Sequence, residues 1–192
     1  MIPGEYIDRI VKIEGIYSDD AADPGGETYC GISRRHHPDW DGWEILDCLE
    51  DKTGYEATSA LRDHVASHYN RHFWYPIHGD AIYAISRRLS WKVFDVAVSK
   101  GVRRASEYLQ RALNLVNLGG RLYDDLAVDG IIGPVTVRAI ELLYASSLLT
   151  EKDTDRMLIN TLSVFQGMSY VSFLESGHGR EKFRGLLLRI FH

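Results

Sequence analysis

The chain has 192 residues, of which 45% are hydrophobic and 26% are charged, and its formal net charge is -5. This composition is typical of one globular domain or two small lobes, and it excludes a disordered or fibrous protein. A general nucleic-acid-binding role is disfavoured, because the chain has no overall positive field that would hold a polyanion.

The amino-terminal residues MIPGEYIDRIVKIEG lack the charged start and long apolar run of a secretory signal. No stretch approaches the roughly 20 apolar residues of a membrane helix. We therefore expect a chain made in the cytoplasm, with no stable membrane insertion. Without a signal peptide, Cys30 and Cys48 are expected to be free thiols rather than a disulfide.

Apolar residues at helical spacing predict a first helix over residues 4–14, which Gly15 ends. The next segment, SDDAADPGGETYCGIS, is rich in turn formers and predicts a loop with a small β element; PDWDGW predicts a second turn. The same spacing predicts further helices over residues 56–73, 82–98, 105–116, 134–149, 153–174 and 180–191. The predicted fold class is mainly α with one small β-hairpin element.

Glu14 is the candidate general acid. Ile7, Ile10 and Val11 precede it at helical intervals, so the predicted helix places Glu14 on its core-facing stripe. Desolvation there, together with the partial negative charge of the helix C-terminus, is expected to raise its pKa. A carboxylic acid that stays protonated can donate its proton to the leaving oxygen of a glycosidic bond. The alternative is a Glu that turns into solvent or pairs with Lys12 or an arginine.

Glycoside hydrolysis also needs a group across the scissile bond from the acid. Asp23 follows Glu14 by nine residues, and Thr28 comes five residues later. The Pro-Gly-Gly turn between Asp23 and Thr28 permits a return toward Glu14 but does not require one. Asp23 is therefore the candidate base, with the Thr28 hydroxyl holding the attacking water. The alternatives are an Asx turn at Asp23, or Asp19 or Asp20 as the second carboxylate.

The run EGIYSDDAADPGGETYCGIS resembles the signature of glycoside hydrolase family 108, the N-acetylmuramidases of phage lysins and bacteria. YNRHFW, VFDVAVSKG and LQRAL resemble the family in the same order, and DGIIGPVTVRAI and EKFRGLLLRI resemble the peptidoglycan-binding module that commonly completes these proteins. The resemblance implies a lysozyme-like helical fold with Glu14 as the catalytic glutamate. It also implies a muramidase catalytic lobe at residues 1–101 and a helical peptidoglycan-binding-like lobe at residues 102–192 packed on it.

The order Glu, Asp, Thr is similar to that of phage lysozymes, which assigns Asp23 and Thr28 to water activation and implies inversion at the anomeric carbon. Leu187 stands near where the terminal segment of the family usually has a Trp, and three further positions depart from the family pattern. Ile16 replaces the second Gly after the catalytic Glu, Cys30 stands where an aromatic residue is usual, and Ser99 stands where Asn is common.

Polysaccharide grooves use aromatic faces against sugar rings and short polar side chains against hydroxyls. Core packing is an equal alternative for each residue of these types. The candidates within the family-like segments are Tyr29, Tyr69, Asn70, Trp74 and Ser99.

His64, His68 and His72 recur every four residues on a predicted helix, a spacing that can bind zinc. No Glu sits beside the first His, so the metalloprotease pattern is missing. The favoured interpretation is a polar helix flank, and neither a metal nor a cofactor is expected.

The sequence thus predicts a monomer. It predicts that the protein hydrolyses the β-1,4 bond between N-acetylmuramic acid and N-acetylglucosamine in peptidoglycan glycan strands. One alternative is a noncatalytic cell-wall-binding or secretion-assisting protein, and another is a lytic transglycosylase, in which the sugar's own hydroxyl attacks. The expected place of action is the cell wall in the periplasm, reached after export or holin-mediated release.

Overall fold

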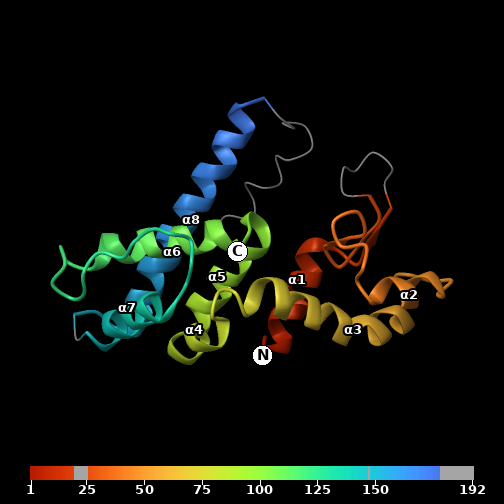
Figure 1. The fold of residues 1–192 in the computed structure, drawn as a ribbon, viewed down its shortest axis with the longest axis horizontal. Coiled ribbons are helices and arrows are strands. Elements are labelled where there is room, and N and C mark those ends of the chain that lie inside the picture. The colour runs from red at the N-terminus through yellow and green to blue at the C-terminus, as the bar shows by residue number, and fades with distance from the viewer. Residues whose placement is uncertain (20–25, 147, 178–192) are drawn as a thin grey trace. The chain divides into compact units, whose positions relative to one another are not determined.

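The computed structural model describes residues 1–19, 26–146 and 148–177 (Figure 1). Helices dominate these ranges, and a small antiparallel sheet supplies the β structure, so the predicted fold class is confirmed. The helix predicted over residues 180–191 lies outside the described residues. The chain divides into two compact units, Met1–Tyr75 and Pro76–His192.

Helix α1 (Gly4–Glu14) opens the first unit and has the bounds that the sequence predicts. It buries Tyr6, Ile7 and Ile10, the stripe expected from the helical period, and it packs against α3. The helix ends because Gly15 adopts φ 81° and ψ 167°, a backbone conformation that is essentially restricted to glycine.

Three two-residue strands form an antiparallel sheet in the order β1-β2-β3: β1 (Tyr17–Ser18), β2 (Thr28–Tyr29) and β3 (Ile32–Ser33). Tyr29 pairs with Ile32, so only Cys30 and Gly31 form the connecting turn. Both have positive φ, 47° and 80°, which is the pattern of the type I′ turn that suits a two-residue hairpin. The predicted β element is therefore a hairpin extended by one more strand.

Helices α2 (Gly42–Asp47) and α3 (Tyr55–Tyr69) complete the first unit, and α3 continues into a π-helical turn, η1 (Asn70–Trp74). The sequence predicts only a turn where α2 begins, because six residues are too few to show a helical period. The predicted helix over 56–73 is confirmed as α3 and η1. In η1 the Tyr75 N–H donates to the Asn70 carbonyl at 2.9 Å, which changes the direction of the side chains that follow.

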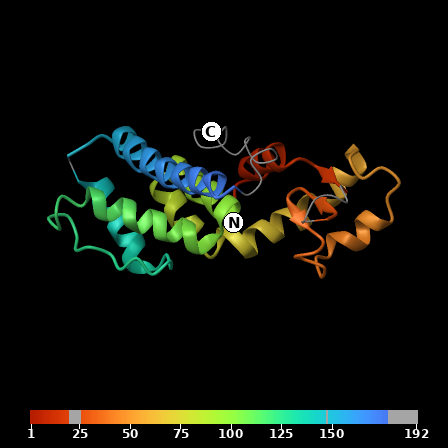
Figure 2. The same ribbon diagram turned by 90° about the horizontal axis from the view of Figure 1, so that it is seen from above.

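The second unit is built of five described helices: α4 (Gly79–Ile85), α5 (Arg87–Lys100), α6 (Val102–Val116), α7 (Pro134–Ala145) and α8 (Glu151–Glu175). Helix α5 is buried along most of its length and contacts α4, α6 and α8 (Figure 2). The single helix predicted over 82–98 is two helices, because Ser86 is extended and its Oγ accepts the Leu89 N–H to cap α5.

Helix α8 is long and apolar enough to span a membrane by length and composition, a test that core helices of water-soluble proteins also satisfy. In this structure one side of α8 packs within the second unit. Its Gln166 accepts from the buried Lys92 ammonium at 2.9 Å and donates to the Ser99 hydroxyl at 3.0 Å. Helix α5 packs against both α6 and α8 within the second unit, and the lobe boundary expected between residues 101 and 102 stays a prediction.

Candidate active site

Glu14 is exposed, and the prediction that it is buried in an apolar wall is wrong. The buried stripe of α1 ends at Ile10, and the helix itself ends at Glu14. Ile13 beside it is also exposed. Periodicity gave the correct face of the helix, but in the described part of the chain the packing over that face leaves the Glu14 side chain exposed.

The β2–β3 turn positions the aliphatic part of Glu14. A Cβ placed on Gly31 would lie 3.0 Å from Glu14 Cγ and 2.7 Å from the Tyr69 hydroxyl oxygen. The same hydroxyl donates to the Cys30 carbonyl at 2.8 Å, and the Cys30 N–H donates to the Ile16 carbonyl at 2.7 Å. The structure thus brings together the end of α1, the hairpin turn and the end of α3 around one accessible carboxylate.

Thr28 lies on β2, where it pairs with Ser18 and Ser33. Its Oγ1 donates to the Gly26 carbonyl at 3.0 Å, so the hydroxyl proton is used at the end of the preceding loop. Asp23 and Asp20 lie outside the described residues, and the predicted roles of Asp23 and Thr28 in water activation stay predictions.

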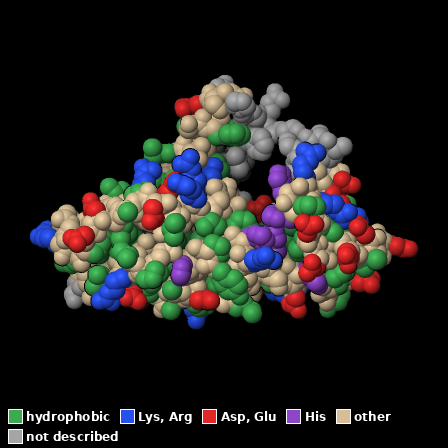
Figure 3. Space-filling view, viewed as in Figure 1, with side chains coloured by type: hydrophobic (Ala, Val, Ile, Leu, Met, Phe, Trp, Pro, Cys, Tyr) green, Lys and Arg blue, Asp and Glu red, His purple; other side chains and the backbone are tan. Residues whose placement is uncertain are grey.

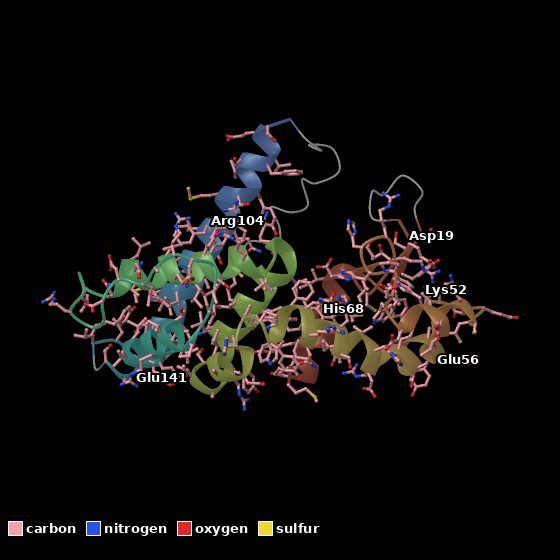
Figure 4. All side chains as sticks on the ribbon, in the orientation of Figure 1. Asp19, Lys52, Glu56, His68, Arg104 and Glu141 are labelled. Atoms are coloured by element: carbon pink, nitrogen blue, oxygen red, sulfur yellow. The ribbon has the colours of Figure 1, made fainter. Side chains whose placement is uncertain are left out.

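Glu27 is a charged residue near this site that the sequence analysis missed. One carboxylate oxygen accepts from Lys52 at 2.9 Å and from the Tyr17 hydroxyl at 3.0 Å, and the other pairs with Arg34 at 2.8 Å. Lys52 is labelled in Figure 4. Arg34 also binds both carboxylate oxygens of Asp47. No spacing in the sequence predicts this network, because its members come from β1, from the residues just before β2 and just after β3, from the end of α2 and from the segment that follows α2.

Hydrogen bonds within the network shift the pKa values of Asp47 and Lys52. The hydrogen bond from Arg34 is the largest cause that lowers the pKa of Asp47, and the bond to Glu27 is the largest that raises the pKa of Lys52. Burial raises the pKa of Tyr17. Glu27 therefore serves as the anionic partner of two cations, and it fixes the chain just after residues 20–25.

The aromatic candidates for sugar contact are buried. Trp74 is 0% exposed, with Tyr6 packed edge-on at 5.7 Å; Tyr29 is 1% exposed and stacks on Trp40 at 6.1 Å between ring centroids. Burial raises the pKa of Tyr29 to about 12. A ring covered by protein offers no face to a glycan, so these positions favour the core-packing alternative.

The remaining candidates also have structural partners. Asn70 is buried, and its Oδ1 accepts the Ile2 N–H at 2.8 Å, which ties the amino terminus to η1. Tyr69 is buried beneath the hairpin turn, as described above. Ser99 belongs to the second unit, where it donates to the Val96 carbonyl at 3.3 Å and accepts from Gln166. Sugar binding by these residues stays a prediction.

The cysteines and the histidines complete the comparison with the sequence. Cys30 and Cys48 are free thiols, as expected. His68 and His72 lie together, but the third imidazole beside them belongs to His37 and not to His64. The sequence thus predicted only part of this feature. In the folded chain a histidine from a distant segment joins the histidines of the helix.

Two family models match the chain. Residues 7–101 match the family described as glycosyl hydrolase 108, and residues 104–187 match a predicted peptidoglycan domain. Residues 7–101 belong to the glycosyl hydrolase 108 family. Glu14 and the hairpin lie within the matched range, and the two matches together indicate a peptidoglycan-degrading enzyme, with peptidoglycan as its substrate or partner.

A solved structure of SagA from Brucella abortus is similar to this chain over 97% of its residues and 91% of the SagA chain, with 20% identity and a TM-score of 0.52. At this identity the likeness concerns the fold alone, and it agrees with the mainly α, lysozyme-like fold expected from the sequence. The comparison with curated proteins finds no match.

We expect Gly31→Ala to destabilise the hairpin and displace Glu14. The added Cβ imposes a left-handed backbone cost of about 1–2 kcal/mol and also collides with Glu14 and Tyr69. Gly26→Ala is the matched control, because Gly26 also has positive φ but has open space around its Cα. Urea unfolding should show a larger decrease in the free energy of unfolding for Gly31→Ala than for Gly26→Ala. Equal decreases in the two variants would contradict a tight contact at Gly31.

Glu27→Gln should lower the free energy of unfolding by about 1–3 kcal/mol, because in this half-buried setting Lys52 loses its anionic partner and Arg34 loses one of its two. Asp8→Asn removes the exposed ion pair with Arg62 in the same unit and should cost less than about 1 kcal/mol. Chemical denaturation of both variants checks the difference, and a loss for Glu27→Gln no greater than the control would count against an anchoring role.

Proposed function

We propose that this chain is an N-acetylmuramidase, which hydrolyses the β-1,4 bond between N-acetylmuramic acid and N-acetylglucosamine. The observation that carries the proposal is the placement of Glu14 in the glycosyl hydrolase 108 domain. Its stem rests against the Gly31 turn, and its carboxyl group is accessible to a strand lying along the surface. The predicted peptidoglycan domain supports the same substrate class.

Exposure of Glu14 in the free protein is compatible with the role of a general acid. A glycan strand lying over the end of α1 would displace water from the carboxyl group, and loss of water favours the neutral form of a carboxylic acid. The neutral form then donates its proton to the leaving glycosidic oxygen as the bond to the anomeric carbon breaks. In this proposal the substrate supplies the desolvation that the sequence analysis assigned to the protein core.

The water that attacks the opposite face of the sugar needs a base, and we assign this role to Asp23 with Thr28 as its helper. Asp23 takes one proton from the water as the oxygen bonds to the anomeric carbon, and the configuration inverts. Glu27 is unsuited to the role, because Lys52 and Arg34 already engage its two oxygens. The assignment of Asp23 rests on the order of residues in the sequence.

Glu14→Gln is expected to lower the rate of release of soluble fragments from purified peptidoglycan by at least about 100-fold, the usual contribution of a positioned acid. Glu5→Gln is the matched control, since Glu5 is an exposed residue of the same helix. Both variants should keep the melting temperature of the parent protein. Undiminished cleavage by Glu14→Gln would remove Glu14 from the mechanism, and wall binding by the parent protein without cleavage would favour a noncatalytic role.

Asp23→Asn separates hydrolysis from transglycosylation. If Asp23 activates water, the variant should lose at least about tenfold in rate, with Asp19→Asn as the control acid that precedes the loop. A lytic transglycosylase uses the sugar's own hydroxyl, so its products carry anhydromuramic ends. Mass spectrometry of the fragments should show reducing ends for the parent protein; anhydromuramic ends would refute hydrolysis.

A further inference from the structure

Three imidazoles meet on the surface of the first unit. The nearest ligand nitrogens of His37, His68 and His72 all lie within 4.8 Å of one another. The ring centroids of His68 lie 4.5 Å from those of both His37 and His72. Histidine side chains gather visibly on this face of the molecule (Figure 3). Glu14 does not belong to this cluster.

The backbone around the cluster is fixed. His68 is the penultimate residue of α3 and His72 lies in η1, so the imidazole of His72 follows that of His68 by about one helical turn. The His37 N–H donates to the Ser33 carbonyl at 2.9 Å, and its own carbonyl accepts from the Trp43 indole at 2.7 Å. These bonds hold the segment after β3 against α2 and direct His37 toward the other two histidines.

One imidazole ring of the cluster is buried, and the other two are more exposed and so less restricted in rotation. His68 is 7% exposed, whereas His37 is half-buried and His72 is exposed. All three line an open cleft of about 500 Å³, whose other charged lining groups include Asp39, Asp41 and Arg71. Burial, with a smaller contribution from the neighbouring imidazoles, lowers the pKa of His68 to about 3.

We propose that His37, His68 and His72 form a binding site for a divalent transition-metal ion, with Zn²⁺ as the preferred ion. Imidazole nitrogens bind Zn²⁺ at about 2.0–2.1 Å, which places the nitrogens of a tetrahedral site roughly 3.4 Å apart. The nitrogens of the three histidines lie within 4.8 Å of one another, and rotation of the two less buried rings would bring them to the tetrahedral spacing. Three protein ligands leave one position that faces the cleft, where water or a nearby carboxylate completes the shell.

The ion would join two segments that are far apart in the sequence. His37 lies between β3 and α2, and the other two ligands lie where α3 passes into η1. A bound ion stabilises the folded form in proportion to the logarithm of its concentration over its Kd, because the unfolded chain does not hold the three rings together. The site therefore predicts stabilisation of the first unit by Zn²⁺, whatever bond the enzyme cleaves.

Thermal unfolding of the full chain, prepared without a histidine tag and freed of metal with a chelator, tests the site. Added Zn²⁺ should raise the melting temperature, and calorimetric titration should give one ion per chain. His37→Gln and His72→Gln should each weaken binding by more than about tenfold, since loss of a mere outer partner of a metal ligand already costs 10–100-fold. Circular dichroism first confirms that the variants fold.

His64→Gln is the matched control, because His64 lines the same cleft one turn before His68 but lies outside the cluster. It should bind Zn²⁺ as the parent protein does. Co²⁺ gives a second readout, because its visible absorption reports a tetrahedral nitrogen site in the parent protein and should be lost in His37→Gln. Absence of a one-to-one Zn²⁺ complex, or equal weakening in His64→Gln and His37→Gln, would overturn the proposal.

Discussion

Two glycines with positive φ control the geometry on which the candidate active site depends. Helix α1 ends at Gly15, whose backbone conformation is essentially restricted to glycine, and the chain continues from there into β1. Gly31 lets β2 and β3 join through two residues and leaves space for the stem of Glu14. Because a side chain at Gly31 would occupy the position of Glu14 and Tyr69, the carboxylate is placed by close backbone approach rather than by burial.

Ion pairs and a tyrosine hydrogen bond hold the segments of this arrangement together. Glu27 binds Lys52 and Arg34 directly before β2, which fixes the start of that strand. The Tyr69 hydroxyl supports the turn between β2 and β3. A site of this kind is rigid at its base and open at its surface, which suits a substrate as long as a glycan strand.

The sequence predicted those features that depend on local patterns. The bounds of α1 follow from its apolar period and its terminal glycine, and the small sheet follows from the turn formers after it. The exposure of Glu14 could not be predicted, because a helical period shows which face is apolar but not whether another element covers it. The break at Ser86 was missed because α4 and α5 are both apolar, so their patterns merge into one.

Features that depend on tertiary contacts could not be predicted, because a local pattern does not show which distant segments pack together. Trp74 and Tyr29 have the chemistry of sugar-binding residues, but the packing of α1, α3 and the segment around Trp40 encloses them. The pair His68 and His72 is visible as a helical spacing, whereas His37 joins it only through folding. Local sequence thus predicts which side chains are suited to chemistry, and tertiary structure decides which of them meet.

A crystal structure of the Glu14→Gln protein with a bound peptidoglycan fragment tests the central claim most directly. The account predicts that a glycosidic oxygen lies about 2.6–3.2 Å from the side chain at position 14, next to the Gly31 turn, which is the reach of a proton donor. A fragment bound with every glycosidic oxygen far from position 14 would contradict it.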